Sequence, residues 1–152
     1  MSDSSVPAAI ELPPIDQVAY MVHDLDDAIR RFSAVFGPFT TMTADNKGAV
    51  YRGHAHDAHM KLAFGKSGDL EIELIEHVSG ECPHKDWIEA NGESLFHVRF
   101  MVDDVDAKLA ELVELGYETV WYNHMEEFGI KYAYAQAPPD QGGHIFELGQ
   151  GF

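Results

Sequence analysis

An internal repeat constrains this chain more than any other feature of its sequence. Residues 15–26 align without gaps with residues 95–106, and the two copies share Val18, Met21, Val22, Asp24 and Asp26 of the first copy as identical residues. The copies also end alike, because residues 68–74 resemble residues 142–148. A repeat of this kind predicts two copies of one supersecondary unit that pack against each other.

Each copy shows the same order of local patterns. An alternating stretch is followed by a helical spacing of apolar residues, at Leu25, Ala28 and Ile29 in the first copy, and three further strand-like stretches come after it. Asp24 and Asp104 precede the two helical stretches and are suited to cap them. The sequence therefore predicts an α+β fold of two tandem βαβββ modules, with the helices on the outside of a sheet.

The chain divides into four segments within one compact domain. We expect an extended arm over residues 1–14, a first module over 15–76, a linker over 77–94 and a second module over 95–152. The linker is expected to contain one short helix over residues 85–91. Further strands are expected at about 49–53 and 59–64 in the first module, and at 118–122 and 131–136 in the second.

Composition excludes several classes of function. The chain has 152 residues, of which 45% are hydrophobic, and its 10 basic and 26 acidic residues give a net charge of −16. This charge repels nucleic acid and anionic membranes, and the sequence has neither a signal peptide nor a membrane-spanning stretch, so we expect a cytoplasmic protein. Cys82 is the single cysteine, which excludes an internal disulfide and a thiolate-rich zinc site.

The alternation of side chains along a strand predicts which residues share a face. Val18, Tyr20 and Val22 form one apolar face, and in the second copy Phe96, Val98, Phe100 and Val102 form the equivalent face toward the helices. Four polar side chains are left at equivalent places on the opposite face, and they are Gln17, Glu73, His97 and Glu147.

Two carboxylates, an amide and an imidazole are costly to bury together unless a cation neutralises them. One nitrogen and three oxygen ligands suit a six-coordinate divalent metal. They do not decide which metal is bound, so zinc, nickel, cobalt, manganese, iron and magnesium are all compatible with them. The alternative is that Glu73 and Glu147 are solvated residues of an exposed sheet face and that His97 is a core histidine. The matched positions in the two copies favour the metal site.

Other candidate residues have a functional and a structural interpretation. Arg99 follows His97 on the same face and could bind a substrate carboxylate or phosphate, or form a surface ion pair. Tyr132 and Tyr134 alternate on one face and could line a pocket or cover a helix. The cluster His54, His56 and His59 is interpreted as a loop near a strand end, with its role left open.

Four stretches together resemble the vicinal oxygen chelate superfamily, which contains glyoxalase I, methylmalonyl-CoA epimerase, extradiol dioxygenases and bleomycin-resistance proteins. They are residues 15–17, 72–74, 92–98 and 142–148, and the resemblance extends from Ile15 to Leu148. It implies a cupped, mostly antiparallel sheet whose hollow holds a divalent metal, and it implies a homodimer. Gln17, Glu73, His97 and Glu147 match the ligand positions of the family, in the pattern of zinc-type glyoxalase I, whereas residues 85–97 look more like the epimerases.

This resemblance implies a metal-dependent isomerase or lyase acting on a small molecule. The metal would stabilise an enediolate formed when the carbon beside a carbonyl loses its proton, with Glu147 as the base and Glu73 as its counterpart. One alternative is a binding protein of the bleomycin-resistance type, which sequesters a drug without metal. A ring-cleaving dioxygenase is a third possibility, and Gln17 argues against it because such enzymes hold iron with two histidines and a carboxylate.

Overall fold

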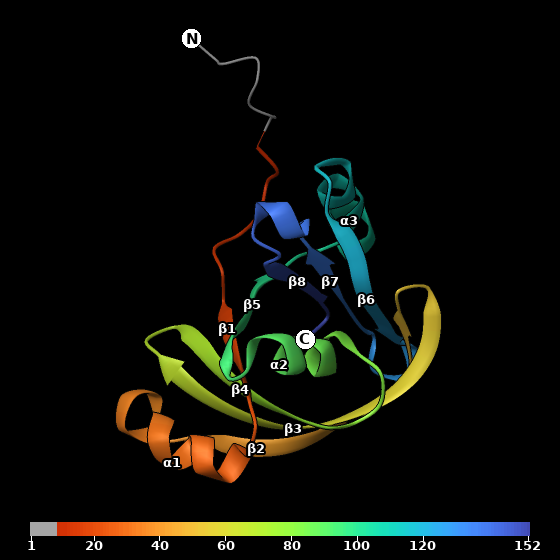
Figure 1. The fold of residues 1–152 in the computed structure, drawn as a ribbon. Helices are drawn as coiled ribbons and strands as arrows, with labels where there is room; N and C mark the ends of the chain where they lie inside the picture. Colours follow the sequence, from red (N-terminus) through yellow and green to blue (C-terminus); the bar gives the residue numbers. More distant parts are fainter. Residues whose placement is uncertain (1–8) are drawn as a thin grey trace.

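The computed structural model describes residues 9–152, which form a curved eight-stranded sheet with three α-helices (Figure 1). The strands and helices follow in the order β1 (Gln17–Val22), α1 (Leu25–Phe36), β2 (Thr40–Tyr51), β3 (His54–Ser67), β4 (Leu70–Ser79), α2 (Pro83–Asn91), β5 (Ser94–Met101), α3 (Val105–Glu114), β6 (Glu118–Met125), β7 (Ile130–Gln136) and β8 (Ile145–Gln150). Two short 3-10 turns, Glu126–Phe128 and Pro139–Gln141, flank β7. The predicted α+β class and the predicted strand and helix order are confirmed.

The sheet closes into a barrel with the strand order β1-β4-β3-β2-β6-β7-β8-β5. The two modules have the same internal strand pairing. In the first module β1 runs parallel to β4, and in the second β5 runs parallel to β8. The modules join through an antiparallel contact of β1 with β5 and a short antiparallel contact of β2 with β6. The sheet is therefore mostly antiparallel, as expected.

The helices α1 and α3 cover the outer face of their own modules, at opposite ends of the molecule in Figure 1. Asp24 caps α1 by accepting a hydrogen bond from the Asp27 amide, and Asp104 caps α3 by accepting one from the Ala107 amide. Leu25 and Ala28 of α1 pack with Val22 and Leu74. In α3, the residues Val105, Leu109 and Leu112 pack with Ala133, Ala135 and Leu148. Amphipathic helices thus bury the predicted apolar faces of the strands.

The central strands of the first module are longer than predicted, and the interpretation of residues 54–59 as a loop was wrong. These residues form the first part of β3, which pairs with β2 from Tyr51↔His54 onward. The strands are joined through Arg52 and Gly53, whose φ angles are 48° and 88°. Two consecutive positive φ angles are typical of a tight hairpin turn, so the extended structure continues on both sides of it.

The predicted face of Phe96 was also wrong, because this side chain packs inside the barrel against α2 rather than beneath α3. The pairing of β1 with β5 shifts by one residue at this point, where Ala19 faces His97 and Tyr20 faces Leu95. Phe96 is the extra residue of this bulge, and its ring lies 5.6 Å from that of Trp87 in α2. The helix α2 starts at Pro83, two residues before the expected start.

Part of the predicted N-terminal arm, residues 1–8, lies outside the described residues. Within the described part of that arm, Ile10 and Leu12 pack against the apolar cluster that α3 forms with β7 and β8. In residues 9–152 no helix has the length and hydropathy needed to cross a membrane.

Candidate active site

The pairing of the strands brings the four predicted polar residues to one place inside the barrel. Gln17 pairs with Glu71, so that Glu73 lies two residues further along β4. In the second module, Arg99 pairs with Glu147 of β8. The contact between β1 and β5 then sets Gln17 opposite Arg99, which joins the two halves of the site.

His97 is at the centre of this cluster. Its Nε2 atom lies 2.8 Å from Oε1 of Gln17, 3.1 Å from Oε2 of Glu147 and 3.6 Å from Oε1 of Glu73. All four side chains are buried, with exposed fractions of 1% for Gln17, 8% for Glu73, 4% for His97 and 5% for Glu147. The buried arrangement excludes the alternative that the two acids are solvated residues of an exposed face.

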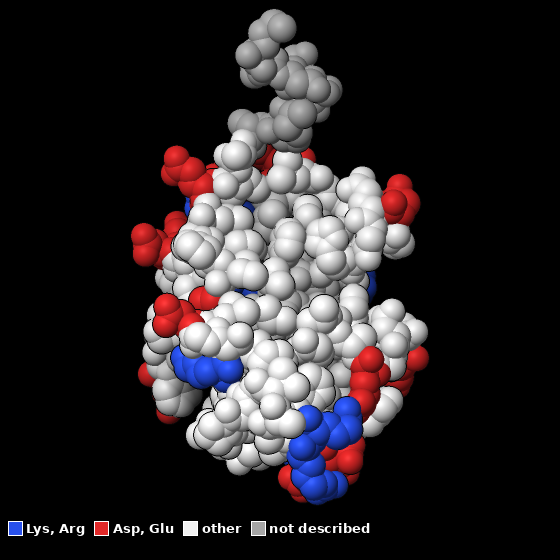
Figure 2. Space-filling model, turned by 90° about the vertical axis from the view of Figure 1, so that its left-hand side faces the viewer, with Lys and Arg blue, Asp and Glu red and all other residues white. Residues whose placement is uncertain are grey.

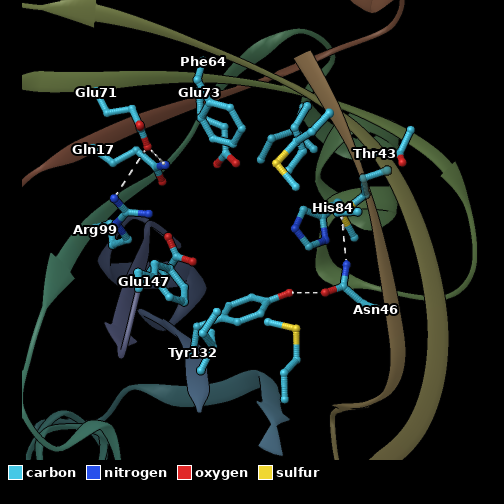
Figure 3. A pocket seen from close by; sticks show the side chains of 18 of the residues that line it. Gln17, Thr43, Asn46, Phe64, Glu71, Glu73, His84, Arg99, Tyr132 and Glu147 are labelled. Carbon is cyan, nitrogen blue, oxygen red and sulfur yellow. Dashed lines mark hydrogen bonds and ion pairs between the residues drawn. The ribbon is translucent and has the colours of Figure 1, made fainter. Parts of the chain in front are cut away.

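The orientation of the Gln17 amide is fixed by a neighbouring acid. Its Nε2 donates a hydrogen bond to Oε1 of Glu71 at 2.8 Å, which leaves its carbonyl oxygen directed at His97. Glu71 also lies 3.6 Å from the guanidinium of Arg99. Figure 3 shows Gln17, Glu71, Arg99 and Glu147 together on one side of the cavity.

The site has more acidic than basic side chains. Burial and the proximity of Glu147 raise the pKa of Glu73 well above its usual value, and Arg99 opposes this effect only in part. The guanidinium of Arg99 is itself held by Asp16 through two hydrogen bonds of 3.0 Å. The two buried acids therefore lack a cation of their own among the described residues.

Two buried polar atoms of the cluster have no hydrogen-bond partner among the described residues, namely Nδ1 of His97 and Oε2 of Glu147. Nε2 of His97 lies 3.1 Å from this carboxylate oxygen, but it is directed at Gln17. Buried polar atoms normally have a partner, so an unpaired carboxylate oxygen indicates that a ligand or ion is missing from the cluster.

The donor atoms fit a divalent metal in their chemistry and spacing. Two ligands of one ion at about 2.0–2.2 Å lie roughly 3 to 3.6 Å from each other, which is the range of the contacts that His97 makes with Glu73 and Glu147. In the described part of the chain, however, no group of three or more His, Cys, Asp or Glu side chains has the arrangement of a ready-made metal site. Binding an ion would therefore require the side chains to adjust and would depend on Gln17 as a further donor.

The cluster forms part of the wall of a cavity of about 730 Å³. Gln17, Glu73 and Glu147 line it, and so do the predicted substrate-binding residues Arg99, Tyr132 and Tyr134. Most of the remaining wall is apolar, and it consists of Met42, Ala44, Met60, Leu62, Phe64, Ile75, Met125, Phe128, Ile130 and Phe152. Of the predicted site residues, His97 lies in the cluster but is not among the lining residues, and the others line the cavity. Their roles in binding and catalysis stay predictions.

Sequence reasoning missed most of the other residues of this cavity, among them the buried polar residues Asn46 and His84. Asn46 is buried on β2, and His84 projects from α2 with its Nε2 2.9 Å from the hydroxyl of Tyr134. Neither belongs to the repeat, so the comparison of the two copies gave no signal for them. Asn46 lies between the exposed polar residues Asp45 and Lys47, so no pattern in the sequence shows that its side chain is buried.

The histidine cluster at the start of β3 does not form a metal site within the described residues. His59 instead contacts Asp45 on the neighbouring strand, with 2.6 Å between its Nδ1 and the carboxylate, and both side chains are exposed. His56 packs edge-on against Tyr51 at 5.8 Å between ring centroids. These contacts account for two of the three histidines as side-chain pairs across the β2–β3 hairpin.

Acidic side chains lie around the margin of the face shown in Figure 2, and the centre of this face is largely uncharged. Several of the basic residues are paired with acids, as Arg31 is with Asp27 and Arg52 with Glu118. The negative charge of the chain is therefore only locally compensated at its surface.

Comparison with solved structures finds the same fold in methylmalonyl-CoA epimerases. A variant of the Streptomyces coelicolor enzyme in complex with 2-nitronate-propionyl-CoA superimposes with a TM-score of 0.67 and 24% identity, over 92% of this chain and 95% of that one. The enzyme from Mycobacterium tuberculosis gives a TM-score of 0.63 and 19% identity, over 97% and 93%. A Bacillus halodurans protein described as hypothetical gives 0.61 and 20%, over 90% and 93%.

No curated protein matches the chain significantly. The family model described as the glyoxalase, bleomycin resistance protein and dioxygenase superfamily matches residues 16–134, which include nearly all of the first module and most of the second but end before β8 and Glu147. The duplicated modules and the buried cluster around His97 are consistent with the family that this match identifies. The chain belongs to the glyoxalase, bleomycin resistance protein and dioxygenase superfamily.

Proposed function

We propose that this chain is a divalent-metal-dependent isomerase or lyase that removes a proton from the carbon next to a carbonyl group of a small oxygenated substrate. The observation that carries the proposal is the convergence of Gln17, Glu73 and Glu147 on Nε2 of His97, in the wall of a cavity large enough for a small molecule. The fold that the chain shares with methylmalonyl-CoA epimerases supports an isomerase-type reaction.

The residues proposed to hold the ion are Gln17, Glu73, His97 and Glu147. A divalent cation at this place would act as a Lewis acid on two neighbouring oxygens of the substrate and make the adjacent C–H group more acidic. Glu71 positions Gln17 by accepting its amide hydrogen bond, so that the amide oxygen is the atom presented to the site.

Glu147 is proposed as the base. Its Oε2 has no hydrogen-bond partner among the described residues, so this oxygen is free to accept a proton. Glu73 approaches the same His97 nitrogen from the other module and is proposed to act as the counterpart of Glu147. Return of a proton to the opposite face of the same carbon would give epimerisation, and return to the neighbouring carbon would give isomerisation.

Proton exchange in deuterated water tests this proposal. The protein, supplied in turn with zinc, nickel, cobalt and manganese, is incubated with a panel of 2-oxo acids, 2-hydroxy ketones and acyl thioesters, and deuterium beside the carbonyl is followed by NMR. We expect metal-dependent exchange on at least one compound, and a loss of at least about 100-fold in Glu147→Gln. Glu118→Gln, which removes an exposed acid of β6, serves as the control.

Two results would count against the proposal. Exchange that persists in Glu147→Gln would remove this residue from the role of base. Absence of metal uptake in a calorimetric titration of chelator-treated protein would favour the metal-free binding protein instead, a function that the largely apolar wall of the cavity would also suit. Light scattering on the same samples tests the expected homodimer.

A further inference from the structure

The part of the cavity wall that faces the acidic cluster contains two buried and neutral polar side chains, while the exposed Asp45 beside them is paired with His59. Figure 3 shows His84 and Asn46 on the side of the cavity opposite Gln17 and Glu147. Tyr132 lies between the two sides and directs its hydroxyl at Asn46. The cavity therefore has two chemically different ends, one with buried acids and one with neutral hydrogen-bonding groups.

The side-chain amide of Asn46 is held in one orientation. Its carbonyl oxygen accepts a hydrogen bond of 2.6 Å from the hydroxyl of Tyr132 and one of 2.9 Å from Nδ2 of Asn123. All three residues are buried, and Asn46 is 5% exposed. Two donors on the oxygen leave the NH₂ group as the part of this amide that can serve a ligand.

The NH₂ group of Asn46 has only a poor acceptor. Its one partner among the described residues is the thioether sulfur of Met60, at 3.9 Å. A thioether is a weak acceptor, and an amide NH₂ group can donate two hydrogen bonds. Asn46 lines the cavity, so a substrate oxygen could take the place that the sulfur fills poorly. An unused donor that is held rigidly needs little further ordering when it binds a ligand.

His84 is a second group of the same kind at this end of the cavity. Its Nε2 is paired with the Tyr134 hydroxyl at 2.9 Å, while its Nδ1 is buried and has no partner among the described residues. This residue also lines the cavity. Two neutral nitrogen groups with unused hydrogen-bonding capacity thus occur at the end that is remote from the acids.

The charges around the cavity limit what can bind there. Arg99 is the one cationic side chain among the described lining residues, apart from any protonated histidine, and its guanidinium is engaged by Asp16 and Glu71. None of the described lining residues is a lysine. An anionic group at the far end would therefore meet no free cation, whereas an uncharged oxygen would meet the amide of Asn46.

We propose that Asn46 is a specificity-determining residue, which donates a hydrogen bond to an uncharged acceptor oxygen of the substrate. The substrate is then a small and mainly apolar molecule, with two neighbouring oxygens at the acidic end and a separate carbonyl or ether oxygen at the other. This inference rests on the proposed function. The acidic cluster must hold the two neighbouring oxygens of the substrate for Asn46 to bind the separate oxygen at the other end of the cavity.

Matched pairs of hydroxamates test this inference by calorimetry with the zinc-loaded protein. A hydroxamate offers two neighbouring oxygens, and an acetyl group differs from an isopropenyl group by an oxygen in place of CH₂. The probes are benzohydroxamates with an acetyl or an isopropenyl group at the meta or para position. We expect at least one acetyl probe to bind about 5- to 10-fold more tightly than its isopropenyl partner, as one added hydrogen bond predicts.

Two variants test whether Asn46 causes the preference for the acetyl probe. Asn46→Asp keeps the acceptor oxygen that serves Tyr132 and Asn123 but removes the NH₂ donor, so the preference for the acetyl probe should disappear or reverse. Thr43→Val removes a hydroxyl from an exposed cavity-lining position of the same strand and should retain the preference. Thermal melting checks that both variants are folded.

A spectroscopic measurement on the unaltered protein does not depend on the folding of a variant. In ¹⁵N-labelled protein, the side-chain NH₂ resonances of Asn46 should shift with the acetyl probe and much less with its isopropenyl partner. If both probes of every pair bind with equal affinity and shift the NH₂ resonances of Asn46 equally, the role of Asn46 is contradicted while the proposed function stands. If no hydroxamate binds at any metal loading, the proposed metal-dependent function itself fails, and the inference with it.

Discussion

The side-chain amide of Gln17 on β1 is oriented by residues of the two neighbouring strands. The amide donates to Glu71 on β4 and faces His97 on β5 with its oxygen, while its own strand β1 lies between these two. An amide oxygen is uncharged, so Gln17 as the proposed ligand would add a coordinating oxygen without adding to the repulsion between the two buried acids.

Replacement of Gln17 tests whether this oxygen is a metal ligand. We expect Gln17→Ala to lower the affinity for zinc by at least about 10-fold, because one of four donors is lost. Competition with a fluorescent chelator measures the affinity, and Thr43→Ala is the control in the same cavity. Equal affinity in the unaltered protein and in Gln17→Ala would exclude Gln17 as a ligand.

Among the secondary-structure elements, the caps of α1 and α3 were predicted from the sequence and are confirmed. Asp24 and Asp104 each accept a backbone hydrogen bond from the first turn of their helix, at 2.9 and 3.1 Å. We expect Asp24→Ala and Asp104→Ala each to lower the free energy of unfolding by about 1 kcal/mol. Urea denaturation measures this loss. Asp103→Ala removes the same charge beside the Asp104 cap, and an equal loss there would show that charge, not capping, is responsible.

The repeat predicted the two outer helices, the order of the strands and the grouping of Gln17, Glu73 and Glu147 with His97, because equivalent positions in the two copies carry similar chemistry. It did not predict that β1 pairs parallel to β4 and β5 parallel to β8. It did not predict the face of Phe96, since a one-residue bulge between β1 and β5 reverses the alternation there. It also gave no information on Asn46, whose hydrogen bonds reach across to Asn123 on β6 and Tyr132 on β7. Contacts between the modules depend on strand register, which local patterns do not fix.

The helix α2 places a neutral histidine inside the barrel, where it contacts Phe96, Trp121 and Tyr134. Burial lowers the pKa of His84 well below its usual value of 6.5, and the nearby His97 acts in the same direction. A group whose pKa is lowered on folding contributes stability above the pKa of the unfolded chain, and this contribution is lost as the pH falls below it.

We therefore expect the metal-free protein to lose stability between pH 7.5 and pH 5.0, in part through His84. His84→Gln keeps a side chain that can hydrogen-bond to Tyr134 but does not titrate, so its stability should fall less over this interval. Urea midpoints at the two pH values measure the difference. A decrease of equal size in both proteins would show that His84 is already protonated in the fold or does not contribute.

At the scale of the whole molecule, closure of the barrel makes one cavity from two modules. Glu73 comes from the first module and His97 and Glu147 come from the second, while Asn46 and Asn123 meet across the short contact of β2 with β6. A single module would present half of the donor set on an open sheet face. The duplication thus supplies the four proposed metal ligands in matched pairs, whereas Asn46, the proposed specificity residue, has no counterpart in the repeat.

The most direct test of this account is a crystal structure of the cobalt-treated protein with anomalous diffraction at the cobalt edge. We predict one cobalt ion within bonding distance of Gln17, Glu73, His97 and Glu147, at the acidic end of the cavity. A cobalt ion bound elsewhere, or no ion at this cluster after treatment with excess cobalt, would contradict the central claim.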